Sequence, residues 1–532
     1  MAVYDAAISL PDDYTTVMEG SLIKSATTNG IKTEEWKTDD PSAGLNLVAG
    51  RYTVTKKTYK GIEIATYFFE KDDALSRVYI NKTKEYLDMY AWLIGPYPFK
   101  KFAVVESFLP TGYGMPSFTL LGSAVLRLPF IPGTSLGHEI AHNWWGNSAY
   151  PAEKGGNWTE ALTTFTADYL YAEKKDEDRE FRFLKLLGYK NFAEASPLTL
   201  GEFSDATEPI SRAIGYNKGA MLFVMLRDEI GADAFSTGLK AFYSEFRFKN
   251  ASWADIRQAF EKASGQDLGW FFSQWLDKPG GPAVSIEGPV LKWPKGANYL
   301  VQFTIRQANP RAITLPVRFE TKSGAVSLEI KVSKEVEPVY AELGAEPLAF
   351  EIDPDYRVFR ILSDAETPAS LSSCFGDKDA VIVVPSQKEA ADKYEALAEL
   401  ISKDYGAAIA TVADAASYDG KTVFILGGPD ENPAFELIRE RLPKDASIDH
   451  ATLRLPDGAY DMNGNLFALA LKDTLGSRRA VCAFFGSGSK GTVFETGKRL
   501  RYFGESGWLV FNGSSSPAKG RFSGQKVLRH EF

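Results

Sequence analysis

One segment of the sequence has residue types and a spacing that can bind a metal ion and activate water: His138-Glu139-Ile140-Ala141-His142. Residues four apart lie on one face of a helix, so His138 and His142 can bind one ion together. Neutral imidazole is a good zinc ligand, and Glu139 is placed to take a proton from a water molecule that the metal activates. The chain has only 4 histidines, so this spacing around a glutamate is improbable by chance. The segment predicts one Zn²⁺ per chain and hydrolysis with Glu139 as general base.

Two imidazoles leave a zinc ion under-coordinated, and a catalytic site needs a third protein ligand and one open position. The candidates are Glu153 and Glu160. Glu153 lies in a turn-like stretch, which is a poor place to hold a carboxylate rigidly. Glu160 lies in the first turn of a helix predicted over residues 158–173, from which it can point at the metal. In the alternative, Glu160 caps its own helix in a capping box that begins at Asn157.

The helix that carries the two histidines must be held by neighbouring elements, several of which the sequence predicts. It is expected to begin near Thr134 or Ser135 and to end at Gly146-Asn147. Two strands precede it, over residues 102–105 and 118–121, joined by the turn-rich stretch at residues 111–114. Apolar residues at helical spacing predict further helices over residues 75–94, 158–173, 178–190, 214–230, 232–246, 253–264 and 267–276.

At 532 residues the chain has room for roughly three or four domains. The pattern is that of a multidomain α+β protein. Strand-rich residues 1–70 form a short N-terminal β unit, and residues 71–278 form the α/β domain with the metal segment. Short strands separated by turns predict a β-sandwich over residues 283–363. Strands that alternate with helices predict an α/β domain over residues 376–532 with a largely parallel sheet.

Composition limits the partners and the compartment. The net charge of -9 argues against nucleic acid and against an anionic lipid surface. No apolar run is long enough for a transmembrane segment, and the first residues do not form a signal peptide. We therefore expect a soluble protein, either cytoplasmic or exported with its signal removed. Cys374 and Cys482 are predicted to be two buried thiols, with a disulfide as the alternative.

The segment at residues 138–147, followed by Trp158-Thr159-Glu160-Ala161, resembles the aminopeptidase N-type zinc metallopeptidases, the gluzincins. The resemblance covers roughly residues 1–363, and further matching motifs lie at residues 95–100, 215–220 and 267–275. It implies a thermolysin-like catalytic domain, zinc-dependent hydrolysis of peptide bonds, and Glu160 as the third zinc ligand. It also implies that Tyr216 stabilises the oxyanion, a role that suits a phenol because it donates without carrying charge.

The chain departs from this family where the family holds the free α-amine of its substrate. The family has a Gly-x-Met-Glu-Asn stretch there, whereas residues 112–118 of this chain contain no glutamate. Glu106 is a candidate replacement for the glutamate that binds the amine. The preferred interpretation is that Glu106 is a solvated residue of a strand. The spacer between His142 and Glu160 is also one residue shorter than in the family. The backbone of the substrate-binding stretch is expected to align the peptide as an added strand; its residues are Gly112, Tyr113, Gly114 and Met115.

Together with the short N-terminal unit, the missing glutamate favours an open cleft and internal cleavage of peptides. Two alternatives stay open. One is a strict aminopeptidase with a replacement amine anchor. The other is a catalytically weak scaffold or binding protein that acts through its C-terminal domain. In that case the C-terminal domain would bind an unknown partner protein. The intact pair of Glu139 and Tyr216 argues against the scaffold, because binding alone needs neither residue.

Overall fold

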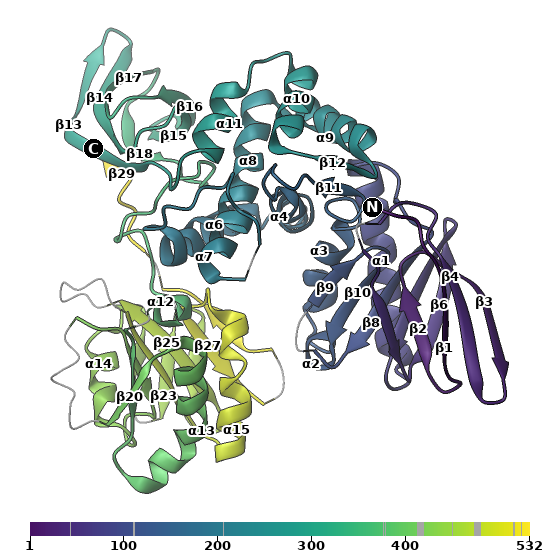
Figure 1. The fold of residues 1–532 in the computed structure, drawn as a ribbon. Helices are drawn as coiled ribbons and strands as arrows, with labels where there is room; N and C mark the ends of the chain where they lie inside the picture. Colours follow the sequence, from purple (N-terminus) through teal and green to yellow (C-terminus); the bar gives the residue numbers. More distant parts are fainter. Residues whose placement is uncertain are drawn as a thin grey trace.

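The computed structural model describes residues 1–42, 44–109, 112–205, 207–375, 377, 379–411, 420–449, 451–472, 480–513, 516–522 and 524–532. Figure 1 shows an N-terminal β unit beside a helix-rich central domain, with a β-sandwich and an α/β domain beyond it. The fold is multidomain α+β, as the sequence predicts. Among the described residues, no helix combines the length and the apolar character needed to cross a lipid bilayer.

The N-terminal unit consists of two small antiparallel sheets. One has the order β1 (Asp5–Pro11), β4 (Ile31–Lys37), β3 (Ser21–Thr28), and the other pairs β2 (Thr15–Met18) with β5 (Leu47–Gly50). The next two strands, β6 (Thr53–Tyr59) and β7 (Ile62–Phe68), lie in the sheet of the central domain and not in the unit predicted over residues 1–70. The reason is a long-range contact: β7 is mostly buried and pairs in parallel with a later strand.

The central sheet has the order β6-β7-β8-β10-β9, with β8 at Lys101–Ser107 and β10 at Phe118–Gly122. Its edge strand is β9 (Gly112–Met115), which pairs antiparallel with β10. Residues 112–114 were predicted to be part of a turn, and that prediction is wrong; residue 111 lies outside the described residues. The two glycines lower the strand propensity of this stretch, so its own sequence conceals the strand that pairing with β10 stabilises.

Helices cover the sheet and build the rest of the central domain. Helix α3, which carries His138 and Glu139, is shorter than predicted: it ends at Ala141, and His142 is its C-cap. Two helical runs contain a π-helical segment, η2 and η3, of the kind often found at functional sites. The helices are α1 (Asp73–Leu93), α2 (Ser123–Leu126), η1 (Ile131–Gly133), α3 (Ser135–Ala141), α4 (Thr159–Thr163), η2 (Thr164–Tyr169), α5 (Leu170–Glu173), α6 (Asp178–Ala193), α7 (Pro209–Arg212), η3 (Ala213–Lys218), α8 (Gly219–Ile230), α9 (Ala232–Phe246), α10 (Trp253–Ser264) and α11 (Gly269–Leu276).

The β-sandwich is built from two antiparallel sheets. Three strands form one sheet, β13 (Ala283–Lys295), β14 (Asn298–Ala308) and β17 (Val336–Leu343). The other has the order β16-β15-β18-β29, with bounds Gly324–Val332, Ile313–Thr321, Pro347–Ile352 and Arg529–Glu531. The last strand comes from the C-terminus, so the region predicted as a separate α/β domain over residues 376–532 returns to the sandwich at its end (Figure 1).

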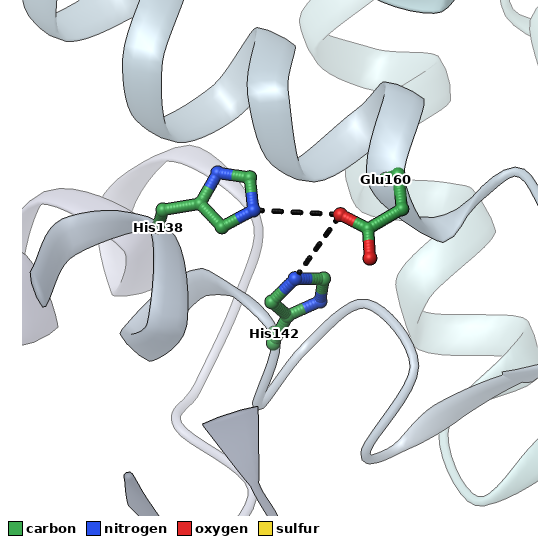
Figure 2. Close-up of side chains that lie close together, drawn as sticks. All are labelled: His138, His142 and Glu160. Atoms are coloured by element: carbon green, nitrogen blue, oxygen red, sulfur yellow. Dashed lines mark ion pairs between the residues drawn. The ribbon is translucent and has the colours of Figure 1, made fainter. Parts of the chain in front are cut away.

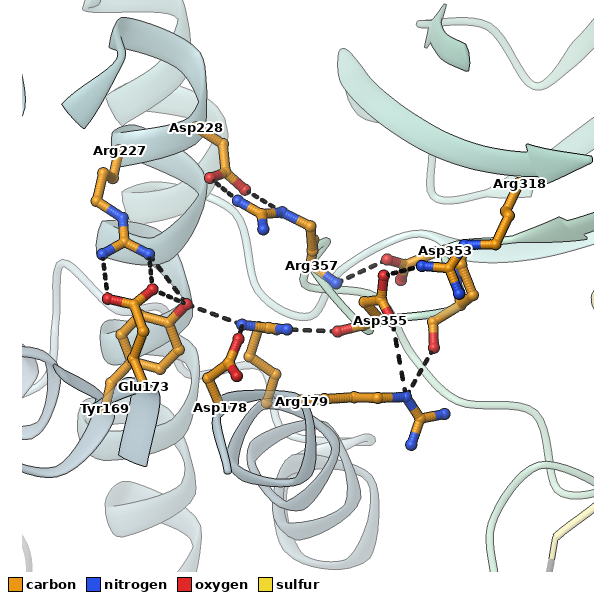
Figure 3. Close-up of polar contacts among 12 residues, drawn as sticks. Tyr169, Glu173, Asp178, Arg179, Arg227, Asp228, Arg318, Asp353, Asp355 and Arg357 are labelled. Carbon is orange, nitrogen blue, oxygen red and sulfur yellow. Dashed lines mark hydrogen bonds and ion pairs between the residues drawn. The ribbon is translucent and has the colours of Figure 1, made fainter. Parts of the chain in front are cut away.

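Ion pairs join the sandwich to the central domain. Arg357 follows the sandwich strand β18 and pairs with Asp228 of α8, while Arg179 of α6 lies 3.8 Å from Asp355 (Figure 3). On the central-domain side, the Tyr169 hydroxyl accepts hydrogen bonds from Arg182 at 2.8 Å and from Arg227 at 3.1 Å. Tyr169 ends the π-helical segment η2, so the network reaches the helical run that carries Glu160.

The α/β domain contains a seven-stranded sheet with the order β20-β19-β21-β26-β25-β27-β28. The first four strands are parallel and the last four antiparallel, so the predicted largely parallel sheet describes only half of it. Cys374 and Cys482 form a disulfide, and the prediction of two buried thiols is therefore wrong. The described elements include α12 (Leu371–Phe375), β19 (Val381–Val384), α13 (Lys388–Tyr405), β20 (Ala408–Thr411), β21 (Val423–Leu426), η5 (Pro433–Phe435), α14 (Glu436–Arg439), β22 (Ser447–Ile448), β23 (Thr452–Leu455), β24 (Gly458–Asp461), β25 (Leu466–Lys472), β26 (Ala480–Gly486), α15 (Lys490–Gly497), η6 (Leu500–Phe503), β27 (Trp508–Phe511) and β28 (Ala518–Gly520).

Candidate metal centre

Helices α3 and α4 bring together three side chains that could hold a metal ion. The Nε2 atoms of His138 and His142 each lie 3.4 Å from Oε2 of Glu160 (Figure 2). The potential ligand atoms of the three residues all lie within 4.8 Å of one another. In the described ranges of the chain, no other group of three histidine, cysteine or acidic side chains meets this criterion. The arrangement is the one expected for a three-ligand zinc site with an open fourth position.

The oxygen of Glu160 that faces both imidazoles supports a metal at this point. Glu160 Oε2 is buried and has no hydrogen-bond partner. A buried oxygen without a partner is costly, and a cation held between it and two imidazole nitrogens would satisfy it. The capping alternative for Glu160 is wrong, because α4 has no side-chain cap and no capping box. The other candidate, Glu153, is exposed and lies outside the cluster.

Both histidines are oriented through their second ring nitrogen. His138 Nδ1 lies 3.1 Å from Oδ2 of Asp168, and His142 Nδ1 lies 3.0 Å from the carbonyl oxygen of Trp145. An acceptor at Nδ1 fixes the proton there and leaves Nε2 free for the metal. Asp168 follows Glu160 by eight residues in the same helical run, and η2 turns both carboxylates toward the histidines. The spacing of eight residues from Glu160 could have identified Asp168, but Asp168 was not among the residues predicted from the sequence.

The charges of the cluster favour a cation at its centre. Burial disfavours a charged imidazole, yet the carboxylates of Asp168 and Glu160 raise the pKa of His138 above its usual value. Burial also acts to lower the pKa of His142, but the carboxylate of Glu160 raises it overall. Burial also acts to raise the pKa of Glu160, but the two histidines lower it overall. Ligand atoms must be deprotonated to bind a metal, so binding of a metal ion by these three side chains would release protons.

Glu139 lies against the edge strand of the central sheet. A Cβ atom at Gly114 would lie 2.7 Å from Oε2 of Glu139, and one at Gly112 would lie 3.5 Å from Oε1. The two glycines of β9 therefore let the carboxylate approach the strand backbone closely. The side chains of Tyr113 and Met115 alternate to the other face, where Tyr113 is 48% exposed and Met115 packs on a small hydrophobic cluster.

Tyr216 lies beside the same cluster. Its ring stacks on the imidazole of His138, with centroids 5.9 Å apart and planes 9° from parallel. Burial and the neighbouring Glu160 carboxylate raise the pKa of Tyr216, so the phenol keeps its proton and can donate a hydrogen bond. Tyr216 lies inside the π-helical segment η3 and not at the start of a helix, because the run already begins at Pro209.

Asn143, which follows helix α3, is hydrogen-bonded to the turn between β9 and β10. Its Oδ1 accepts hydrogen bonds from Ser117 N at 2.9 Å and from the Tyr97 hydroxyl at 3.2 Å. Its Nδ2 donates to the carbonyl of Ile140 at 2.9 Å. Ser117 has a φ of 67° in the turn between β9 and β10, so this contact fixes an unusual backbone conformation. The sequence analysis did not identify Asn143 as important.

Glu106 does not reach the metal centre. It is buried in β8, where its carboxylate pairs with Arg127 at 2.5 Å and accepts from Phe69 N at 2.9 Å. It is therefore neither the solvated strand residue that was expected nor a substitute anchor for a substrate amine.

Comparison with known proteins agrees with this centre. Residues 134–275 match the peptidase family M1 domain. Similar proteins include aminopeptidase N of Lactococcus lactis subsp. lactis, 29% identical over 28% of this chain and 19% of that protein. Aminopeptidase M1 of Arabidopsis thaliana is 32% identical over 29% of this chain and 18% of that protein. Tricorn protease-interacting factor F2 of Thermoplasma volcanium is 23% identical over 62% of this chain and 44% of that protein. The chain thus spans less than half the length of these relatives.

A solved structure has a similar fold. It is Legionella pneumophila aminopeptidase A in complex with aspartic acid, with a TM-score of 0.58 and 19% identity over 70% of this chain and 46% of that one. Residues 134–275 therefore form a domain of the peptidase family M1 type, and the fold is similar to that of an aminopeptidase.

Proposed function

We propose that this chain is a zinc-dependent peptidase that hydrolyses peptide bonds with water. The observation that carries the proposal is the buried Glu160 oxygen, which faces the Nε2 atoms of His138 and His142 and has no hydrogen-bond partner. The three side chains would hold the ion. Bound zinc would supply a Lewis acid that polarises the substrate carbonyl and makes a water molecule more acidic.

The protein's own residues carry the protons and the charge. Glu139 takes a proton from the attacking water and later delivers it to the leaving amine. Tyr216 donates its phenolic hydrogen to the oxygen on which negative charge develops, and burial strengthens that bond because water is excluded. Asp168 keeps the imidazole of His138 in the orientation that the ion needs.

The edge strand β9 aligns the substrate. β9 is the edge strand of the five-stranded sheet, a position at which a peptide can add through backbone hydrogen bonds. Glu139 lies against the face of β9 at Gly112 and Gly114, close enough to act as general base on a peptide aligned by this strand. An added strand would hold each backbone carbonyl of the peptide at a fixed position relative to β9. The fixed register would select one peptide bond for cleavage.

The test combines metal content with hydrolysis of a mixed peptide library read by mass spectrometry. The zinc-loaded protein should contain one zinc per chain and cleave peptides. Glu139→Gln should keep the zinc but lose roughly a hundredfold or more in rate, because it removes the base and leaves the ligands. Glu153→Gln, an exposed glutamate in the neighbouring turn, is the matched control and should retain both properties. Equal rates for Glu139→Gln and the unaltered protein would contradict the proposal.

A further inference from the structure

The turn between β9 and β10 holds one end of the proposed substrate-binding strand, and its own sequence does not favour it. Met115 pairs with Phe118, so Pro116 and Ser117 are the two residues of the turn. The turns that suit a two-residue hairpin, types I′ and II′, need a positive φ at the first residue, whereas the ring of Pro116 fixes its φ at about −65°. Ser117 has a φ of 67°, a conformation that residues with a side chain rarely adopt. Contacts with the rest of the protein must therefore stabilise this turn.

Lys101 contacts the side chain of Ser117 from the start of β8. It is only 3% exposed, and its Nζ donates to Ser117 Oγ at 2.8 Å and to the carbonyl oxygen of Met18 at 2.7 Å. Nζ also lies 5.3 Å from the ring centroid of Trp36 and 5.6 Å from that of Phe118. Met18 and Trp36 belong to the N-terminal unit, so one ammonium group joins that unit to the turn.

The charge of Lys101 is costly to bury at this position. Glu19 and Glu63 act on Lys101 only through their charge at longer range, and no acidic side chain in the described part of the chain forms an ion pair with it. An apolar side chain of the same length would fill the site at less cost, because a buried charge without an ionic partner is unfavourable. Stability of the fold alone does not account for a lysine here, whereas its hydrogen bonds give it a role in holding the turn.

The turn connects Lys101 to the proposed general base. Ser117 N donates to Asn143 Oδ1 at 2.9 Å, and Asn143 Nδ2 donates to the backbone carbonyl of Glu139 at 3.3 Å. Gly114 lies in β9 shortly before the turn, against the carboxylate of Glu139. A shift of the turn would therefore change the distance between β9 and Glu139.

We propose, on the basis of the peptidase function above, that Lys101 is a positioning residue for the reaction: through Ser117 it holds β9 at the distance from Glu139 at which a peptide on this strand is hydrolysed. When the hydrogen bond to Ser117 is lost, the turn relaxes and β9 moves. The peptide then binds more weakly, and its carbonyl is misplaced relative to the general base. The bond to Met18 fixes the other side of the ammonium group, which gives the N-terminal unit a part in aligning the substrate.

Steady-state kinetics of the zinc-loaded protein on one peptide that it cleaves tests this role. Lys101→Met keeps the length of the side chain and removes its hydrogen bonds. We expect KM to rise roughly threefold or more and kcat/KM to fall roughly tenfold or more, since misplacement by about 1 Å can cost a hundredfold. A lysine that only stabilised the fold would leave KM unchanged, because unfolded protein lowers only the apparent kcat. An unchanged KM in Lys101→Met would overturn the proposal.

Lys100→Met is the matched control. Lys100 is the neighbouring lysine in the sequence, but its side chain is exposed and pairs with Asp39 at 2.7 Å. The variant should keep both KM and kcat/KM. Losses in Lys100→Met equal to those in Lys101→Met would overturn a specific role for Lys101.

Ser117→Ala removes the acceptor of the same hydrogen bond and tests the contact from its other side. Its kcat/KM should fall to a similar extent, and the double variant should be worse than Lys101→Met by no more than about twofold, because a shared contact is lost only once. Losses that multiply in the double variant would overturn the proposal. If Lys101→Met does not fold, an unchanged KM in Ser117→Ala overturns the proposal by itself.

Hydrogen exchange read by mass spectrometry gives a measurement that does not depend on activity. In Lys101→Met, the amides of residues 112–118 should exchange roughly tenfold or more faster than in the unaltered protein, while those of the sandwich strand β14 keep their rates. Equal exchange of residues 112–118 in both proteins would overturn the proposal and leave the peptidase function intact. No cleavage by the unaltered protein beyond the Glu139→Gln background would overturn the peptidase function, and the role of Lys101 with it.

Discussion

Gly114 and Glu139 approach each other so closely that a methyl group on Gly114 would lie 2.7 Å from the carboxylate oxygen Oε2. The carboxylate proposed as general base and the strand proposed to align the substrate are thus in direct contact.

We predict that Gly114→Ala displaces Glu139 and lowers kcat/KM by roughly tenfold to a hundredfold, since misplacement of a catalytic group by about 1 Å can cost a hundredfold. Zinc content and thermal stability should change little, because alanine suits a strand better than glycine does. Gly112→Ala is the matched control: its methyl group would meet Glu139 at an ordinary 3.5 Å. If both variants lose activity equally, the close contact at Gly114 is not the cause.

The contact between Asp168 and His138 predicts a change in metal affinity. Asp168→Asn should weaken zinc binding by roughly tenfold to a hundredfold, because it removes the charge that orients the imidazole. Competition with a chromophoric chelator at fixed pH measures this directly. Asp176→Asn, an exposed position just after the same helical run, should bind zinc as the unaltered protein does. An unchanged zinc affinity in Asp168→Asn would contradict the assigned role.

We predict that the free energy of unfolding depends on pH because of Lys101. Burial lowers the pKa of Lys101 to about 7, and its Nζ donates to the Met18 carbonyl and to Ser117 Oγ. The unfolded chain keeps the proton up to the usual value near 10.5, so between these values the unfolded state binds more protons and the stability must rise with pH.

Urea unfolding at several pH values between 7 and 10 should therefore show this rise, and Lys101→Met should reduce its slope. Lys100→Met is the control, since pairing with Asp39 raises the pKa of Lys100 and moves its titration above that window. A slope in Lys101→Met equal to that of the unaltered protein would show that Lys101 does not titrate there.

We predict that the helical run that carries Glu160 is stabilised by the network of polar contacts around Tyr169, which Figure 3 shows. Tyr169→Phe removes an acceptor that serves Arg182 and Arg227, and leaving buried donors without a partner costs about 1–3 kcal/mol. Urea unfolding should show that loss in the free energy of unfolding. Tyr340→Phe, which alters a tyrosine that is 61% exposed on the sandwich, should change it by less than about 0.5 kcal/mol. Comparable losses in the two variants would exclude a specific role for the network.

The sequence predicted the features that depend on local spacing. His138 and His142 lie on one helix, so their separation of four residues was enough to bring them together. The edge strand β9 was missed because its glycines weaken the local signal, and only its pairing with β10 stabilises it. Asp168 and Tyr216 both lie in π-helical segments. Tyr216 was identified through the family resemblance, whereas Asp168 was not among the residues predicted from the sequence. The position of β7 depends on its pairing with β8, a contact between distant segments that no local pattern records.

The return of the chain to the sandwich through β29 makes the α/β domain an insertion between two strands of one sheet. Its entry and exit lie side by side, since Gln525 N donates to the carbonyl of Ala365 at 2.9 Å. An insert held at both ends by adjacent segments can be exchanged for a short connection without moving the strands that flank it. A deletion that joins the two stems is therefore expected to leave a closed sandwich and an intact cluster of His138, His142 and Glu160.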